Sequence, residues 1–302
     1  MNYNEIEAFL AIVETKSLVK ASEKLFTTQS NISYKLNSLE QKINAKLVYR
    51  SQGKKEIELT PKGEEFVSMA KRLISLYKEV DSWSLRDDEV QLKIGSVDSL
   101  NVYVFSDLYK TMLHPTSPIK INVSTHWSKT VYNLLETYEL DLGLILTPVK
   151  SSSLNLNPIF HEKMVLVSDP NLSNYGLLVS PNDLDQSKEV FSNWGPEYML
   201  WHSNHWNPSK YPYLTVDTGS IVFRCLDYPG TWSIVPLSMA KTFQKTQPLK
   251  ISEIIQPPPS RTCYMITHKY PKVSVVKSLE YFEKRLNEFI GSSHLDITPI
   301  NG

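Results

Sequence analysis

The sequence predicts an α/β chain in which a small helical domain precedes a long helix and a larger region of alternating strands and helices. Two observations predict this division. Apolar residues recur at helical spacing up to residue 83, and from residue 90 onward strand-like runs alternate with helix-like ones. The 302-residue chain has no net charge, whereas residues 1–86 carry 14 basic and 11 acidic side chains. The basic character is therefore confined to the N-terminal part.

The segment from Ser17 to Glu40 is predicted to form two helices joined by a tight turn. The apolar residues of its second helix, Ile32, Leu36, Leu39 and Ile43, lie on one helical face because they follow one another at offsets of four, seven and eleven. The opposite face is polar, and its amides and hydroxyls can donate and accept hydrogen bonds at base edges or phosphates. It carries Thr28 as the helix cap, followed by Gln29, Ser30, Ser33, Tyr34 and Asn37.

A helical bundle with a polar outer face would show the same periodicity, so the next segment decides between the two interpretations. The strand-like runs 47–50 and 56–59 flank a polar turn that contains Lys54 and Lys55, which is typical of a winged helix-turn-helix. Residues 16–62 carry ten Lys and Arg against four Glu, a local charge of +6 that suits the phosphates of DNA. Arg50, Lys54 and Lys55 complete the predicted DNA-binding residues.

Over roughly the first 66 positions the chain resembles, without a gap, the LysR-type transcriptional regulators. That family shows S-F-T-x-A-A-x-x-L-x-x-[ST]-Q-[PS]-x-[LIV]-S-x-x-I-x-x-L-E, then L-F-x-R and L-T-x-x-G. The chain departs from it at Leu18, Ser22, Val48, Tyr49 and Tyr34, the last at a place where Arg is common. The matching residues are Ser17, Ala21, Leu25, Thr28, Gln29, Ser30, Ile32, Ser33, Leu36, Leu39, Glu40, Leu47, Arg50, Leu59, Thr60 and Gly63.

A long helix is predicted from Pro61 to Trp83, because apolar residues keep one register and a proline stands near its first turn. Its apolar face is larger than one monomer can bury. The resemblance implies a linker helix that pairs with a second subunit, and the alternative is that this face packs on the chain's own second domain. The charged run from Arg86 to Glu89 is predicted to be a hinge.

The remainder is predicted to be α/β with parallel crossovers, and the resemblance implies a two-lobed effector domain built like a periplasmic solute-binding protein. We expect a winged helix-turn-helix over residues 1–60, the linker and hinge over 61–88, and the effector domain over 89–302. Lobe I would comprise about 89–160 and 262–290, lobe II about 161–261, and the tail from Ser292 no regular structure. Strands are expected at 91–97, 119–125, 142–146, 164–168, 214–217, 233–236 and 261–268, and helices at 100–113, 129–140, 219–227, 238–246 and 273–290, the last ending at Gly291.

Three predicted strands of this region end in polar residues, at 96–99, 125–128 and 217–220. Ligands of open α/β sheets bind at such carboxyl ends. The resemblance implies that Ser96, Asp98, Ser99, Ser128 and Thr218 contact a small effector near Trp194. The alternative is that these hydroxyls cap helices. Asp98 argues against a simple dicarboxylate effector unless another group offsets its charge.

Aromatic residues gather between 194 and 213, around His202 and His205. A structural aromatic cluster, an effector pocket that stacks a planar ligand or a cation, and a metal site are the three interpretations, in that order. No nearby carboxylate or cysteine completes a metal site, so no metal is predicted. The predicted effector-binding residues are therefore Ser96, Asp98, Ser99, Ser128, Trp194, His202 and Thr218.

The sequence also argues against several classes of protein. It contains no G-x-S-x-G, P-loop, G-x-G-x-x-G or HExxH motif, so no enzyme, catalytic residue or cofactor is predicted. No run of eighteen apolar residues occurs, and residues 1–10 carry two acidic and no basic side chains, so we expect a cytoplasmic protein. Cys225 and Cys263 are interpreted as small buried hydrophobes, the alternative being a redox sensor.

The predicted function is sequence-specific DNA binding by a bacterial transcription regulator whose binding or bending of DNA responds to a small-molecule effector held between the two lobes. The resemblance implies a homodimer or homotetramer and names operator DNA, the effector and RNA polymerase as partners. The alternative is a cytosolic small-molecule or metal sensor without direct DNA readout, against which the basic wing argues.

Overall fold

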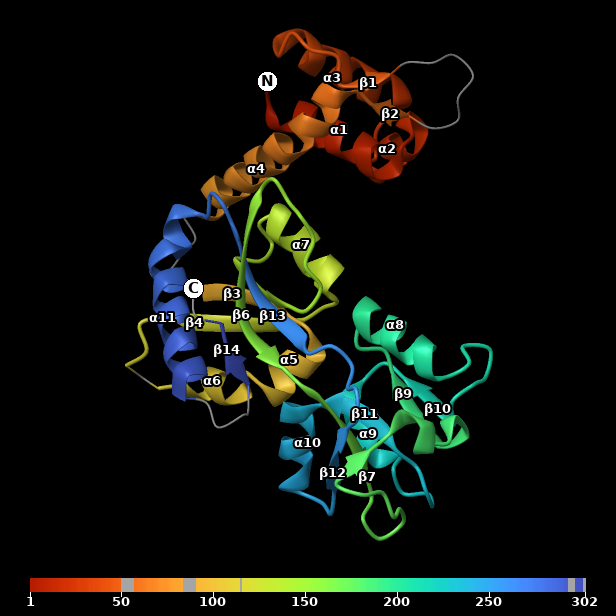
Figure 1. Cartoon of the computed structure of the whole chain (residues 1–302). Coiled ribbons are helices and arrows are strands. Elements are labelled where there is room, and N and C mark those ends of the chain that lie inside the picture. The colour runs from red at the N-terminus through yellow and green to blue at the C-terminus, as the bar shows by residue number, and fades with distance from the viewer. Residues whose placement is uncertain (50–56, 84–90, 115, 293–296, 301–302) are drawn as a thin grey trace. The chain divides into compact units, whose positions relative to one another are not determined.

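The computed structural model describes residues 1–49, 57–83, 91–114, 116–292 and 297–300 (Figure 1). The chain divides into two compact units. The first comprises Met1–Glu89 with Glu136–Glu139, and the second comprises Val90–Leu135 with Leu140–Gly302. Each unit is described by itself below.

Three helices and a two-stranded wing form the start of the first unit. The helices are α1 (Tyr3–Thr15), α2 (Leu18–Lys24) and α3 (Gln29–Lys42), and the antiparallel strands are β1 (Val48–Tyr49) and β2 (Glu58–Leu59). Ala21 has no exposed surface and packs in one core with Phe9 and Leu36, so the small side chain lets α2 approach its neighbours closely. The predicted winged helix-turn-helix is confirmed, while Arg50 and the predicted turn of Lys54 and Lys55 lie outside the described residues.

The linker helix α4 runs from Pro61 to Trp83, with the bounds that the sequence predicts. Its start is tied to the wing. Thr60 Oγ1 donates to the Lys46 carbonyl at 2.6 Å and accepts from the Gly63 amide at 2.9 Å. A Cβ atom on Gly63 would lie 2.0 Å from the Leu47 carbonyl oxygen, so only glycine allows this approach.

The second unit contains a six-stranded sheet in the order β14-β6-β13-β5-β3-β4. Strands β3, β4 and β5 are parallel, whereas β13 runs antiparallel to both β5 and β6. The elements of this lobe are β3 (Gln91–Ser96), α5 (Asp98–Tyr103), α6 (Ser106–Thr111), β4 (Lys120–Thr125), α7 (Ser128–Glu136), β5 (Leu142–Ile145), β6 (Leu154–Glu162), β13 (Arg261–His268), η3 (Val273–Val275), α11 (Val276–Ser292) and β14 (Thr298–Pro299).

The other lobe holds a four-stranded sheet in the order β11-β7-β12-β8 and a pair, β10-β9. The chain enters this lobe after β6 and leaves it before β13, so two segments join the lobes. Its elements are β7 (Met164–Ser168), β8 (Leu178–Val179), η1 (Pro181–Asp183), η2 (Gln186–Lys188), β9 (Val190–Ser192), α8 (Pro196–His205), β10 (Leu214–Val216), α9 (Gly219–Arg224), β11 (Ser233–Pro236), α10 (Leu237–Gln244) and β12 (Lys250–Ile254).

The structure corrects four expectations. The sheets are mixed, because β6 and β13 return antiparallel to join the lobes. The helix expected over 100–113 is two helices, interrupted at Val104 and Phe105, whose side chains are both buried in the core. Helix α11 continues through Gly291 to Ser292, whose hydroxyl donates to the Glu288 carbonyl at 2.8 Å. The tail is not without structure, since Thr298 and Pro299 pair with β6.

Candidate DNA-reading surface and ligand cavity

Helix α3 presents its first turn to solvent. Thr28 has an extended backbone and caps the helix, with Oγ1 accepting from the Asn31 amide at 3.2 Å. Gln29 and Ser30 are exposed, and Tyr34 one turn later has 72% of its surface exposed. Ser33 and Asn37 are half-buried on the same helix. The start of α3 therefore displays a side-chain amide, hydroxyls and a phenol where another molecule can reach them.

Two buried carboxylates fix α3 against neighbouring parts of the first unit. Glu5 on α1 accepts from Lys42 Nζ at 2.6 Å and from Ser38 Oγ at 2.7 Å, and these bonds lower its pKa to about 2. Burial alone would raise the pKa of Glu40, but hydrogen bonds from Lys46 and the Leu47 amide outweigh burial and lower it. These hydrogen bonds stabilise the packing of α3 in the first unit. They do not involve the exposed polar side chains at the start of the helix.

The second unit contains a cavity of about 900 Å³ lined from both lobes. Its wall includes the three strand ends that the sequence singles out: residues 97–99 after β3, 125–128 at and after the end of β4, and 217–219 after β10. A cavity of this size holds a ligand as large as a typical small metabolite. Further wall residues come from the end of β5, at 146–147, and from 192–195 after β9.

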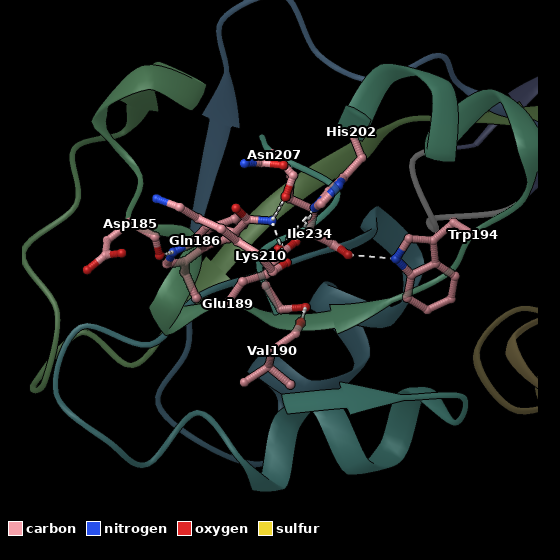
Figure 2. Close-up of polar contacts among 11 residues, drawn as sticks. Asp185, Gln186, Glu189, Val190, Trp194, His202, Asn207, Lys210 and Ile234 are labelled. Atoms are coloured by element: carbon pink, nitrogen blue, oxygen red, sulfur yellow. Dashed lines mark hydrogen bonds and ion pairs between the residues drawn. The ribbon is translucent and has the colours of Figure 1, made fainter. Parts of the chain in front are cut away.

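Five of the seven predicted effector-binding residues line the cavity. Ser99 Oγ accepts from Arg261 Nη1 at 2.8 Å, and Ser128 Oγ accepts from the Leu146 amide at 3.4 Å. Trp194 is held by its Nε1, which donates to the Ile234 carbonyl at 2.7 Å (Figure 2). Asp98 and Thr218 complete the five.

Ser96 and His202, also expected from sequence to contact the effector, do not line the cavity. Ser96 has no exposed surface, and its hydroxyl donates to the Leu144 carbonyl of neighbouring β5 at 2.9 Å. His202 is buried, with Nε2 2.9 Å from one carboxylate oxygen of Glu189 and 3.0 Å from the other (Figure 2). Both side chains have hydrogen-bond partners inside the protein, so they stabilise the fold.

The aromatic residues around His202 form a structural cluster. The His202 ring lies 4.7 Å from the Trp206 ring, 4.9 Å from the Phe191 ring and 5.9 Å from the Tyr198 ring. Burial raises the pKa of Glu189, and the hydrogen bond with His202 opposes that shift. The described part of the chain holds no group of three side chains able to bind a metal ion. This geometry favours the first of the three interpretations of the cluster.

The two cysteines are not paired with each other. Cys263 has no exposed surface and packs in the core of the first lobe, and burial raises its thiol pKa well above the usual value. Cys225 is half-buried against the core of the second lobe. Both positions suit small hydrophobic residues.

Sequence reasoning missed wall residues at the ends of two strands. Thr147 follows β5, a predicted strand, so the carboxyl-end rule applies to it as well. Asn193 follows β9, a three-residue strand that no alternation of polar and apolar residues predicts. Trp127 lies within a predicted strand end, but only the folded structure shows that it lines the cavity, with 67% of its surface exposed.

Asp98 is the acid that the cavity perturbs most clearly. It is half-buried at the first position of α5. Burial raises its pKa, and the carboxylate of Asp217 on the wall raises it further. The cavity is therefore a place where negative charge is already disfavoured.

A reading helix with a wing, a linker helix and a two-lobed domain around a cavity together define a DNA-binding regulator controlled by a small molecule. The comparisons with known proteins agree. Residues 3–64 match the bacterial regulatory helix-turn-helix protein model of the lysR family, and residues 86–274 match the LysR substrate binding domain. The chain belongs to the LysR family of bacterial transcription regulators.

Individual relatives are distant. The chain is 23% identical over 278 residues to the HTH-type transcriptional regulator HdfR of Yersinia enterocolitica, covering 88% of this chain and 90% of HdfR. It is 26% identical over 171 residues to YofA of Bacillus velezensis, a match that spans 59% of YofA and 56% of this chain.

Solved structures share the fold. A full-length variant of OxyR from Pseudomonas aeruginosa aligns with a TM-score of 0.59 at 17% identity, over 98% of this chain and 96% of that one. Full-length CbnR in complex with its target DNA aligns with a TM-score of 0.51 at 17% identity, over 95% of this chain and 100% of that one. Within the described residues, no helix is both long and apolar enough to cross a membrane.

Proposed function

We propose that helix α3 of this regulator reads operator DNA in the major groove. Gln29, Ser30, Ser33 and Tyr34 would contact base edges or nearby phosphates, and the capped start of the helix, at Thr28, would face the backbone. Asn37 would contact the same groove, and Arg50, Lys54 and Lys55 of the wing would contact phosphates. The observation that carries this proposal is the exposed polar start of α3, on a helix that the hydrogen-bonded carboxylates of Glu5 and Glu40 hold in place. The DNA complex of CbnR, a protein of the same fold, supports it.

We propose that the chain divides, in function, at the boundaries expected from sequence. Residues 1–60 would bind DNA, 61–88 would link and pair subunits, and 89–302 would bind the effector, with lobe I at about 89–160 and 262–290 and lobe II at about 161–261. Exposed apolar residues along α4 support self-association as a dimer or tetramer: Met69, Leu76, Tyr77 and Val80.

The cavity of the second unit would hold the effector against Asp98, Ser99, Ser128, Trp194 and Thr218. Its wall comes from both lobes, so a ligand that fills it favours one arrangement of the lobes over another. That preference would change how the subunits present their reading helices to DNA. We propose that the chain acts as a cytoplasmic regulator and not as an enzyme, and that RNA polymerase is a further partner.

The test begins with operator selection from random duplexes by the full-length protein, followed by affinity measurements on the selected and a scrambled duplex. Gln29→Ala should weaken operator binding by roughly 10- to 100-fold and leave binding to the scrambled duplex unchanged, because a lost bidentate base contact carries that much discrimination. Gln41→Ala is the matched control, since Gln41 is an exposed glutamine near the other end of α3.

Unchanged discrimination in the Gln29→Ala protein would show the base-reading assignment to be wrong. The salt dependence of binding tests the alternative of a sensor without DNA readout. A DNA reader loses affinity steeply as salt rises, because phosphate contacts release counterions. A flat dependence, or no binding to any duplex, favours the sensor alternative.

A further inference from the structure

The charges on the cavity wall have one sign. Among the described residues that line it, Asp98 and Asp217 are the acids, and neither lysine nor arginine occurs. The remaining titratable side chain is His126, whose Nε2 lies 2.9 Å from Ser124 Oγ. A ligand in this cavity therefore meets two carboxylates, each from a different lobe.

These carboxylates have few hydrogen-bond partners among the described residues. From the described residues Asp217 accepts a hydrogen bond from the Thr218 hydroxyl, at 3.2 Å. No hydrogen bond or ion pair to the Asp98 carboxylate is found within the described part of the chain, although this side chain is half-buried. Burial and the neighbouring Asp217 both raise the pKa of Asp98. A cation placed between the two would relieve their repulsion and replace the water that burial removes.

The guanidinium of Arg261 does not offset this charge, because it is already paired. Arg261 lies behind the wall, with its guanidinium carbon 5.9 Å from the centre of the Trp194 ring. The carboxylate of Glu162 holds it at 2.7 Å, and its Nη1 donates to Ser99. The Arg261–Glu162 pair is neutral as a unit, so the cavity keeps the charge of Asp98 and Asp217.

Aromatic rings supply the remaining recognition chemistry. Trp194 is fixed by its bond to the Ile234 carbonyl, and Trp127 is 67% exposed on the wall from the other lobe. Indole rings attract cations through their faces and also bury apolar ligand surface. The first turn of α7, at Ser128, favours an anionic group, so a ligand that carries both charges also fits, whereas a dianion meets the two acids.

We propose that the cavity binds a small organic cation, whose protonated amine or guanidinium lies between Asp98 and Asp217 and whose carbon skeleton packs against Trp127 and Trp194. This inference rests on the proposed function, because it takes the cavity to be the effector site.

The test measures the thermal midpoint of the full-length protein with ligands matched in size and opposed in charge. Diaminobutane, agmatine and tryptamine are the cations, and succinate and indole-3-acetate are the matched anions. At least one cation should raise the midpoint by roughly 3 °C or more at saturation, while the anions should not. Calorimetric titration then gives the affinity of the stabilising cation.

Asp98→Asn and Asp217→Asn should each weaken that affinity about tenfold or more, because each removes a charge-assisted contact. Asp107→Asn is the matched control, since Asp107 is an exposed acid in the first turn of α6 that is absent from the cavity wall, and the affinity of this variant should not change. The proposal is overturned by stabilisation with an anion alone, by the absence of stabilisation with every cation, or by equal affinity of the wild type and Asp98→Asn.

The binding measurement uses no DNA, so its failure differs from failure of the proposed function. An anion that binds and alters operator affinity would support the proposed function and contradict the proposal that the ligand is a cation. A cation that binds through Asp98 without altering operator affinity would support the proposed ligand class. It would contradict the proposal that ligand binding controls DNA binding.

Discussion

The proposed DNA-reading surface and the ligand cavity are built in opposite ways. The reading surface is the first part of a single helix, and Glu5 and Glu40 anchor that helix from below. The cavity is assembled from separate stretches of chain at the ends of strands in both lobes. Internal hydrogen bonds alone do not separate the two kinds of polar residue, because Ser99 and Trp194 have such bonds and still line the cavity. A polar residue that is bonded internally and also lies off the wall, as Ser96 and His202 do, stabilises the fold even when its position in sequence suggests a site.

The largest effect that tests this rule is expected at His202. His202→Ala leaves the buried carboxylate of Glu189 without its partner and removes ring contacts, which should lower the free energy of unfolding by about 3 kcal/mol. Calorimetry of the full chain measures the loss. His205→Ala is the control, because His205 is half-buried and contacts Trp201 and Trp206 but no buried acid within the described residues. A His202→Ala protein of normal stability with impaired ligand binding would break the rule.

A smaller loss is expected at the contact between the wing and the linker helix. Gly63→Ala places a methyl group against the Leu47 carbonyl, which should cost about 2 kcal/mol and shift the wing. The free energy of unfolding, measured by calorimetry, and the operator affinity should therefore both fall. Gly291→Ala, also within a helix, meets no atom within 4 Å and should leave both unchanged. Equal effects of the two substitutions would show that the close approach is unimportant.

Ser96→Ala should have a still smaller effect on stability and none on the ligand. It removes one buried hydrogen bond to the Leu144 carbonyl, worth about 1 kcal/mol. Asp98→Asn, two positions along, should show the reverse pattern: altered ligand affinity and near-normal stability. Ligand titrations and melting curves of the two variants distinguish a residue that stabilises the fold from one that contacts the ligand. Equal losses of ligand affinity in Ser96→Ala and Asp98→Asn would contradict this distinction.

A fourth effect is a pH dependence at Glu5. Hydrogen bonds from Lys42 and Ser38 lower its folded-state pKa to about 2, from an ordinary value of 4.5. A lowered carboxyl pKa stabilises the folded state fully above about pH 4.5, and that contribution disappears as pH falls toward 2. The wild type should therefore be more stable than Glu5→Gln at pH 7, and the gap should narrow once the pH falls below about 4.5. A gap independent of pH, or one equal to that of Glu7→Gln, would contradict this account.

Local patterns predict most elements, including β13, but not strand β6 or helix α8. Helix α4 and strands β7, β11 and β13 have the expected bounds, because each has a clear period and clear ends. Strand β6 escapes prediction because Pro158 interrupts it; the proline lies where the pairing with β13 shifts register. Helix α8 escapes prediction as well, since Met199 and Leu200 are exposed apolar residues outside the aromatic face and obscure its period.

Sequence brings together those candidate site residues that are neighbours both along the chain and in space. The polar residues of α3 are predicted together because one helix carries them. Strand ends near the cavity are also predicted, since the carboxyl-end rule applies to any α/β sheet. The rule cannot separate Ser96 from Asp98, because the burial of Ser96 depends on β5, whose Leu144 is 48 residues further along the chain. The partner of His202, Glu189, is likewise set by the tertiary fold.

The absence of a side chain at Gly63 has a mechanical consequence. The Leu47 carbonyl lies against the helix backbone, and Thr60 bonds to both the Leu47 carbonyl and the Gly63 amide, so the start of α4 is held against the wing. A small rotation of the linker helix would therefore turn the whole reading head by the same angle. Because a helix of 23 residues is about 34 Å long, a small rotation about its far end would move its DNA-binding end through a distance that grows with that length.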